Sequence, residues 1–234
     1  MTGKLYGVGV GPGDPKLLTL KAIETIKDAD YVAYPTSGKG ASNIAFEIVK
    51  EYIKDKKTLE YLMPMSRDKE YVQRCHDECA SDIKKYLENG KSVAFITLGD
   101  PSIYSTYMYI HKKIKGMGFQ TQLIPGITSF CAAAASLNDS LCEGGEPLII
   151  VPTSYDALDQ TIDYEGNKVY MKSGRSIVEL RERLREKNML PRTKMVVKAT
   201  MEDEEIFESL DDIDENTSYF SIVVVREEAG GYHD

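Results

Sequence analysis

The sequence is poor in the residues that build metal centres and nucleophilic triads. It contains three histidines and four cysteines in 234 residues. Cys75, His76 and Cys79 lie close together, but His76 would point about 100° away from the helix face that the two cysteines share. No second pair follows at zinc spacing, and no histidine or serine lies in a nucleophile motif. We therefore expect neither a metal bound by the protein nor a Ser-His-Asp triad.

Basic charge and long apolar runs are also scarce. The 29 basic residues are outnumbered by 37 acidic ones, so the formal charge is −8. This argues against nucleic acid as the main partner, although a local basic patch could still hold an anionic ligand. No apolar run approaches the about 20 residues of a membrane span, and the first residues enter a strand directly, without a signal peptide. A cytoplasmic location is expected.

The first half of the chain alternates strand and helix patterns. Strands are expected at residues 4–10, 29–34, 59–63, 93–97 and 120–124. Between them lie helical patterns, of which 17–28 places Leu17, Leu20, Ile23 and Ile26 on one inward stripe. Such alternation predicts a parallel sheet of five strands covered on both faces.

The second half starts a new series of strands after a Pro-Gly turn at residues 125–129. Strands are expected at 148–151, 168–171 and 194–198, followed by two antiparallel strands at 205–210 and 219–225. The chain is therefore expected to form two α/β lobes, 1–125 and 126–234, the second with a mixed sheet.

The stretch 92–109 carries the most specific local signal. The apolar run Val93–Thr97 predicts a buried strand, and Gly99, Asp100 and Pro101 then turn the chain into a helix. Asp100 thus lies at the carboxyl end of a strand, where open α/β sheets bind ligands. The glycine-rich loop 11–15 fits neither the Gly-x-Gly-x-x-Gly nor the P-loop phosphate pattern.

Three stretches, VGVGPGDPKLLTLKA (8–22), ITLGDPSIYSTY (96–107) and IPGITSFCAAAA (124–135), combine with the strand ends at Met171 and Ala199. Together they resemble the tetrapyrrole methyltransferases that use S-adenosylmethionine (SAM). The resemblance implies two α/β lobes with SAM in a cleft between them, and a homodimer. Within the family the chain resembles the C20-methyltransferases of cobalamin synthesis, which act on precorrin-2 or its cobalt-containing counterpart. It has Tyr34-Pro35 where uroporphyrinogen-III methyltransferases carry Tyr-Asp.

The resemblance also implies site residues. SAM contacts are expected at Pro12, Leu98, Gly99, Asp100, Ile103, Tyr104, Thr128, Ser129, Met171 and Ala199. Substrate contacts are expected at Asp14, Tyr34, Lys39 and Arg175, with Lys16 and Arg67 as further cations near the rim and Tyr34 or Tyr155 as a base. Cobalt would arrive inside the tetrapyrrole.

Four readings of the function stay open. The first is C20 methylation of cobalt-precorrin-2, and the second is the same reaction on metal-free precorrin-2. The third is another methyltransferase of this fold that acts on protein or RNA, and the fourth is a non-catalytic binder of SAM or tetrapyrrole.

Overall fold

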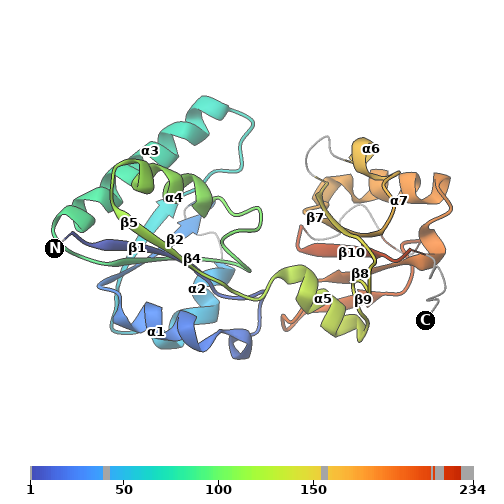
Figure 1. The fold of residues 1–234 in the computed structure, drawn as a ribbon, viewed down its shortest axis with the longest axis horizontal. Helices are drawn as coiled ribbons and strands as arrows, with labels where there is room; N and C mark the ends of the chain where they lie inside the picture. The colour runs from blue at the N-terminus through green and yellow to red at the C-terminus, as the bar shows by residue number, and fades with distance from the viewer. Residues whose placement is uncertain (1, 39–42, 154–157, 212, 214–218, 228–234) are drawn as a thin grey trace. The chain divides into compact units, whose positions relative to one another are not determined.

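The computed structural model describes residues 2–38, 43–153, 158–211, 213 and 219–227, without the side chain of Arg175. The chain divides into two compact units, Met1–Thr128 and Ser129–Asp234, which are described separately below (Figure 1). None of the helices in these ranges combines the length and the apolar character that crossing a membrane requires.

The first unit is a parallel sheet covered by helices on both faces, as the alternating pattern predicted. Its strands run in the order β3-β2-β4-β1-β5 and all pair in parallel. The strands are β1 (Lys4–Gly9), β2 (Tyr31–Thr36), β3 (Lys57–Leu62), β4 (Val93–Thr97) and β5 (Gln120–Ile124). The helices are α1 (Leu20–Asp28), α2 (Ile44–Val49), α3 (Lys69–Glu88) and α4 (Tyr107–Gly116).

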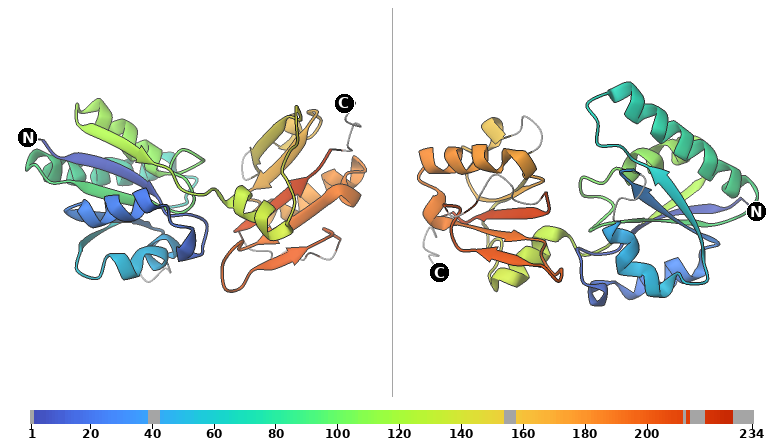
Figure 2. Two further views of the ribbon diagram at one scale, coloured as in Figure 1. Left: turned by 60° about the horizontal axis from the view of Figure 1, so that its bottom comes forward. Right: turned by 180° about the vertical axis from the view of Figure 1, so that it is seen from behind.

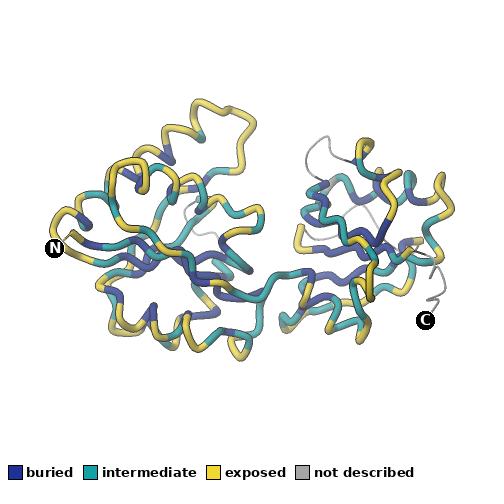
Figure 3. The backbone as a smooth tube through the Cα atoms, viewed as in Figure 1, coloured by how far each residue is buried: buried dark blue, intermediate teal, exposed yellow. Residues whose placement is uncertain are grey.

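The core of this unit has two layers because successive side chains of a strand point to opposite faces. Ala94 and Ile96 of β4 pack with α1 and α2, whereas Val93 and Phe95 pack with α3 and α4. Every residue of β4 is buried, which explains its uninterrupted apolar sequence (Figure 3).

Two expectations in this unit were wrong, one about the direction of a side chain and one about the end of a strand. Leu20 is 80% exposed. The reason is that Pro15–Leu17 forms a separate 3₁₀ turn and α1 starts only after Thr19. The Thr19 hydroxyl caps the helix by accepting a hydrogen bond from the Ala22 amide. Strand β2 does not stop at Tyr34 but continues through Pro35 to Thr36. Proline is tolerated there because β4 pairs β2 only over Tyr31–Ala33 and so has no bond to offer at Pro35.

The second unit contains the expected mixed sheet, in the order β6-β7-β10-β8-β9. Strands β6 and β7 are parallel, and β10 is antiparallel to β7 and β8. The strands are β6 (Leu148–Pro152), β7 (Asn167–Met171), β8 (Thr193–Val197), β9 (Glu205–Phe207) and β10 (Ser221–Val225). The helices are α5 (Ser129–Leu137), α6 (Leu158–Thr161) and α7 (Ile177–Glu186). Helix α5 covers one face of the sheet, and α6 and α7 cover the other (Figure 2).

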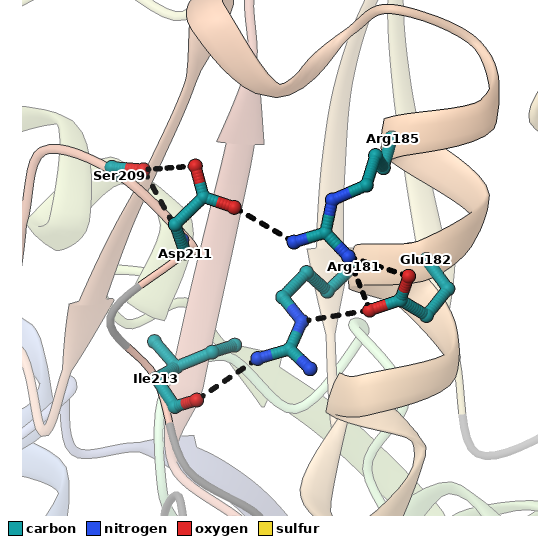
Figure 4. Close-up of polar contacts among 6 residues, drawn as sticks. All are labelled: Arg181, Glu182, Arg185, Ser209, Asp211 and Ile213. Atoms are coloured by element: carbon teal, nitrogen blue, oxygen red, sulfur yellow. Dashed lines mark hydrogen bonds and ion pairs between the residues drawn. The ribbon is translucent and has the colours of Figure 1, made fainter.

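Helix α7 is fastened to the segment after β9 by a chain of charged contacts. Arg185 bonds Glu182 on its own helix and Asp211 across the gap, with an Nη2 to Oδ1 distance of 2.7 Å (Figure 4). Arg181 also bonds Glu182 and donates to the carbonyl oxygen of Ile213 at 3.0 Å. Each guanidinium in this cluster therefore has an oxygen acceptor.

Asp30 ties the start of β2 to the start of β4. Its carboxylate accepts hydrogen bonds from the backbone amide and hydroxyl of Ser92, both at 2.8 Å, and faces the Lys91 ammonium at 3.0 Å. These contacts, the Ser92 amide first, lower the pKa of Asp30 to about 2. A carboxyl group whose pKa is depressed on folding stabilises the fold while it is ionised.

We expect Asp30→Asn to lower the free energy of unfolding at pH 7 by about 1 kcal/mol, allowing for solvent screening of this part-exposed group. The contribution is fully present above the ordinary pKa of 3.8 and is lost as pH falls towards about 2. Urea unfolding of both proteins between pH 7 and pH 3 should show the difference shrinking as pH falls. Asp28→Asn, at an exposed neighbour, is the control. A difference that is constant with pH would contradict this role.

Candidate functional site

The carboxyl ends of β4, β1 and β5 lie side by side at one edge of the first sheet, since these three strands are parallel neighbours. The loops that follow β1 and β4 continue the pairing: the Gly99 amide donates to the Gly11 carbonyl at 2.7 Å, and the Gly11 amide donates back at 3.3 Å. Both glycines have positive φ, +79° at Gly11 and +69° at Gly99, a region that favours glycine.

Three glycine backbones approach one another closely at this edge. A Cβ atom added to Gly9 would lie 2.6 Å from the Gly126 nitrogen and 2.6 Å from the Gly99 oxygen. A Cβ added to Gly126 would lie only 2.3 Å from that same Gly99 oxygen. Side chains are therefore excluded from two of the three positions, and the loops after β4 and β5 meet through backbone atoms.

Asp100 holds this arrangement together. Its Oδ2 accepts a hydrogen bond from the Gly126 amide at 3.0 Å, and its Oδ1 accepts from the Ser102 amide at 2.8 Å and the Ser102 hydroxyl at 2.5 Å. The carboxylate thus joins the loop after β4 to the loop after β5. Both of its oxygens have structural partners, so a direct SAM contact by Asp100 stays a prediction.

Several expected SAM contacts of the first unit gather around this cluster. Pro12 is buried, and Leu98 and Ile103 are half-buried on the adjoining loops. A Cβ at Gly99 would meet only the Ile127 oxygen, at 4.0 Å, so the space beside Gly99 is open. The Thr128 hydroxyl is buried without a hydrogen-bond partner among the described residues. An open space beside an unpaired hydroxyl suits a polar ligand.

In the second unit, Met171 and Ala199 lie at one edge of the mixed sheet. Met171 ends β7, and Ala199 follows β8. Both strands are antiparallel to β10, so they run in the same direction and their carboxyl ends meet where β10 begins, at Ser221. The side chains of Met171 and Ala199 are buried, 8% and 5% exposed.

Backbone strain marks the expected SAM contacts in both units. Six non-glycine residues of the described chain have positive φ. Two of them, Asn138 and Asn188, follow helices, where asparagine commonly adopts this conformation. Of the other four, Tyr104 (+47°) is itself an expected SAM contact, and Lys172 (+58°), Lys198 (+52°) and Thr200 (+67°) are next to Met171 or Ala199. Each costs of order 1 kcal/mol, and such strain is concentrated at functional sites.

Two serines at the edge of the second sheet were missed by the sequence analysis. Ser173 and Ser221 are buried, 1% and 0% exposed, and neither hydroxyl has a hydrogen-bond partner among the described residues. Register places Ser221 directly beyond the Ile222–Met171 pair. The only signal in the sequence is a serine that opens the apolar run Ser221–Val225, which is also compatible with an ordinary strand start.

The structure describes some of the expected substrate contacts and not others. Asp14 accepts a hydrogen bond from the Lys16 amide at 2.8 Å and caps a 3₁₀ turn, and Lys16 and Arg67 are exposed. Lys39, Tyr155 and the side chain of Arg175 lie outside the described parts of the structure.

Tyr34 is unsuited to act as the base. Its ring lies within β2 and packs on Phe46, with 4.9 Å between ring centroids, rather than lying at the strand end. Burial, with the Glu60 carboxylate, raises the pKa of Tyr34 above its ordinary value of 10.0, so less phenolate forms at neutral pH.

Cys75, His76 and Cys79 lie on the buried side of α3. All three are buried, and the His76 ring stacks on Tyr109 with 5.0 Å between centroids. Burial, together with Lys113, lowers the pKa of His76. Within the described ranges, no group of three or more His, Cys, Asp or Glu side chains is placed to hold a metal ion.

The fold is that of known methyltransferases. It is similar to the structure of uroporphyrin-III C-methyltransferase from Thermus thermophilus complexed with S-adenyl homocysteine, with a TM-score of 0.71 and 20% identity, over 96% of this chain and 98% of that one. At this identity the likeness concerns the fold alone.

Sequence comparison defines the family. Residues 4–214 match the model of the tetrapyrrole (corrin/porphyrin) methylases, and the chain belongs to this family. It is 39% identical to a probable cobalt-precorrin-2 C(20)-methyltransferase of Methanocaldococcus jannaschii, over 95% of this chain and 96% of that protein. It is 30% identical to a precorrin-2 C(20)-methyltransferase of a Sinorhizobium species, over 95% of each. The family resemblance expected from the sequence is confirmed.

We expect Gly126→Ala to destabilise the protein by at least about 3 kcal/mol, because its Cβ would overlap backbone atoms that cannot move separately. Gly116→Ala is the matched control, since a Cβ there meets nothing within 4 Å and alanine favours the helix. Thermal and urea unfolding would compare the two. Equal stability of both variants would mean that the glycine cluster is not tightly packed.

Proposed function

We propose that this protein transfers the methyl group of SAM to carbon C20 of cobalt-precorrin-2 in cobalamin biosynthesis. The observation that carries the proposal is the 39% identity to a probable cobalt-precorrin-2 C(20)-methyltransferase along almost the whole of both chains. The cobalt form is preferred because the relative at 39% identity is named for it; two further relatives, at 29% and 30%, are named for cobalt-precorrin-2 and for precorrin-2 and do not separate the two forms. The same reaction on metal-free precorrin-2 is the second candidate.

For the SAM site we propose the residues at the two sheet edges. In the first unit these are Pro12, Leu98, Gly99, Asp100, Ile103, Tyr104 and Thr128, and in the second Ser129, Met171 and Ala199. The residues fit such a ligand: the space beside Gly99 is open, and Thr128 has a buried hydroxyl to donate or accept. Asp14, Tyr34, Lys39 and Arg175 remain the proposed tetrapyrrole contacts.

The chemistry requires alignment more than acid–base groups. SAM supplies, when bound, a methyl group activated by its sulfonium, and transfer leaves S-adenosylhomocysteine while the C20 proton is lost. The glycine cluster and the Asp100 bonds hold the strand-end loops in one arrangement, which limits the entropy lost in orienting the reacting atoms. Apolar side chains such as Leu98 and Met171 would help to exclude water. No described side chain is assigned as a base.

We also propose a cytoplasmic homodimer, following the resemblance to the family. The net charge of −8 supports a small-molecule substrate over RNA. Anionic carboxylates of the tetrapyrrole would then need local cations, for which Lys39 and Arg175 are the proposed residues.

The reaction is tested directly with SAM carrying a ¹³C-labelled methyl group and either cobalt-precorrin-2 or metal-free precorrin-2. We expect mass spectrometry to show the gain of one methyl and NMR to locate it at C20, with faster turnover of the cobalt form. Faster turnover of metal-free precorrin-2 would favour the second candidate. SAM binding without methylation of either tetrapyrrole would contradict the proposal and point to another substrate.

We expect Gly99→Val to weaken SAM binding at least tenfold, equivalent to about 1.4 kcal/mol, because the new side chain enters the open space of the proposed site. Gly118→Val is the control: Gly118 has a φ of +88°, also faces open space and lies after α4, so it carries comparable backbone strain away from the site. Calorimetric titration of both folded variants with SAM gives the comparison. Unchanged affinity in Gly99→Val would remove Gly99 from the site.

A further inference from the structure

The second unit has a pocket of about 100 Å³ on the sheet face that carries α5. Its apolar wall comes from Ala134 and Leu137 of α5, from Leu141 in the following loop and from Val224 of β10. Its charged lining consists of Arg192, Lys194 and Arg226, with one acidic residue, Asp139.

The sheet register concentrates the three cations. Val224 pairs with Lys194, and the Arg226 amide donates to the Arg192 carbonyl at 3.0 Å, so Arg226 lies opposite Arg192. Alternate residues of paired strands share a face, so these side chains lie next to one another on the α5 side of the sheet. They are Arg192, Lys194, Val224 and Arg226. Like charges opposite each other on a sheet are unfavourable unless anions offset them.

Two of the cations have such anions. Lys194 pairs with Glu208 at 2.7 Å. Arg226 donates to the Ser140 carbonyl at 2.5 Å and faces the carboxylates of Glu143 and Glu146 at 3.4 and 3.7 Å.

Arg192 is the exception. Its Nε is buried without a hydrogen-bond partner, and its guanidinium makes no ion pair with any described residue. Asp139 also lines the pocket, but its one hydrogen bond within the described chain is from the Ser140 amide to Oδ1, at 2.7 Å, and it forms no ion pair with Arg192. In the cluster of Figure 4, by contrast, both arginines have oxygen acceptors. A desolvated N–H of a charged group without an acceptor is costly, and a ligand oxygen bound in the pocket that Arg192 lines would lower this cost.

We propose that this pocket binds a small organic carboxylate through the guanidinium of Arg192. The planar fork of arginine matches a carboxylate with two parallel hydrogen bonds. The apolar wall favours a carboxylate with a short alkyl part over inorganic phosphate, which would lose more hydration. The volume limits the bound part to a few heavy atoms.

The pocket is distinct from the proposed methyl-transfer residues. Arg192 ends the 3₁₀ turn before β8 and Lys194 lies near the start of that strand, whereas Ala199 follows its end, and five strand residues span about 15 Å. The carboxylate can therefore come from a free effector molecule or from an acidic side chain of a second copy of this chain.

Titration of ¹⁵N-labelled protein with sodium propionate, at ionic strength kept constant with chloride, tests the proposal. We expect one arginine Nε–H resonance to shift saturably, and to be the resonance that is missing in Arg192→Met. The backbone amides of Leu141 and Val224 should follow the same curve. In Arg192→Met, their shifts should require at least tenfold more propionate.

Arg183→Met is the matched control, since Arg183 lies on α7, pairs with Asp159 and Glu186, and should leave the curve unchanged. A shift of the Arg192 resonance on dilution without propionate would identify a second copy as the source of the carboxylate. If the resonance does not shift on dilution, the source is a free molecule. Three results would overturn the proposal: shifts that do not saturate, an unchanged curve in Arg192→Met, or phosphate acting at the same concentrations as propionate.

Discussion

The close approach of Gly9, Gly99 and Gly126 is the constraint on which the proposed site of the first unit depends. Two of these positions have no room for a Cβ, and the Asp100 carboxylate bonds the Gly126 amide, so three strand ends are held through backbone atoms. The third, Gly99, faces open space. The loops at this edge of the sheet are therefore held in one arrangement beside open space, which suits a reaction limited by alignment rather than by proton transfer.

Much of this fold could be predicted because its signals are local. The apolar run of β4 and the turn at Gly99–Pro101 are properties of adjacent residues. The exposure of Leu20 and the extension of β2 beyond Tyr34 could not be predicted, because they depend on where α1 begins and on which neighbour pairs with β2. Boundaries of this kind are decided by tertiary contacts.

The features missed at the second sheet have a common cause. Lys172, Lys198 and Thr200 adopt positive φ although their residue types do not favour it, so the sequence carries no sign of the strain. The hydroxyls of Ser173 and Ser221 lie where β7 ends and β10 begins and have no partner among the described residues, and Arg192 faces Arg226 because of the register between β8 and β10. These strands are far apart in the chain, and their pairing brings the serine hydroxyls and the two arginines together. The energetic cost of these contacts therefore cannot be inferred from the sequence.

The two edges of the second sheet differ in the chemistry they offer. The edge at Met171 and Ala199 presents buried hydroxyls, which are neutral and can both donate and accept. The opposite edge presents Arg192, Lys194 and Arg226 against an apolar wall. Because Lys194 and Arg226 are paired with acidic side chains, the positive charge left for a ligand is that of Arg192. A pocket of about 100 Å³ holds only a few heavy atoms, so size rather than charge keeps a molecule as large as SAM from entering it as a whole.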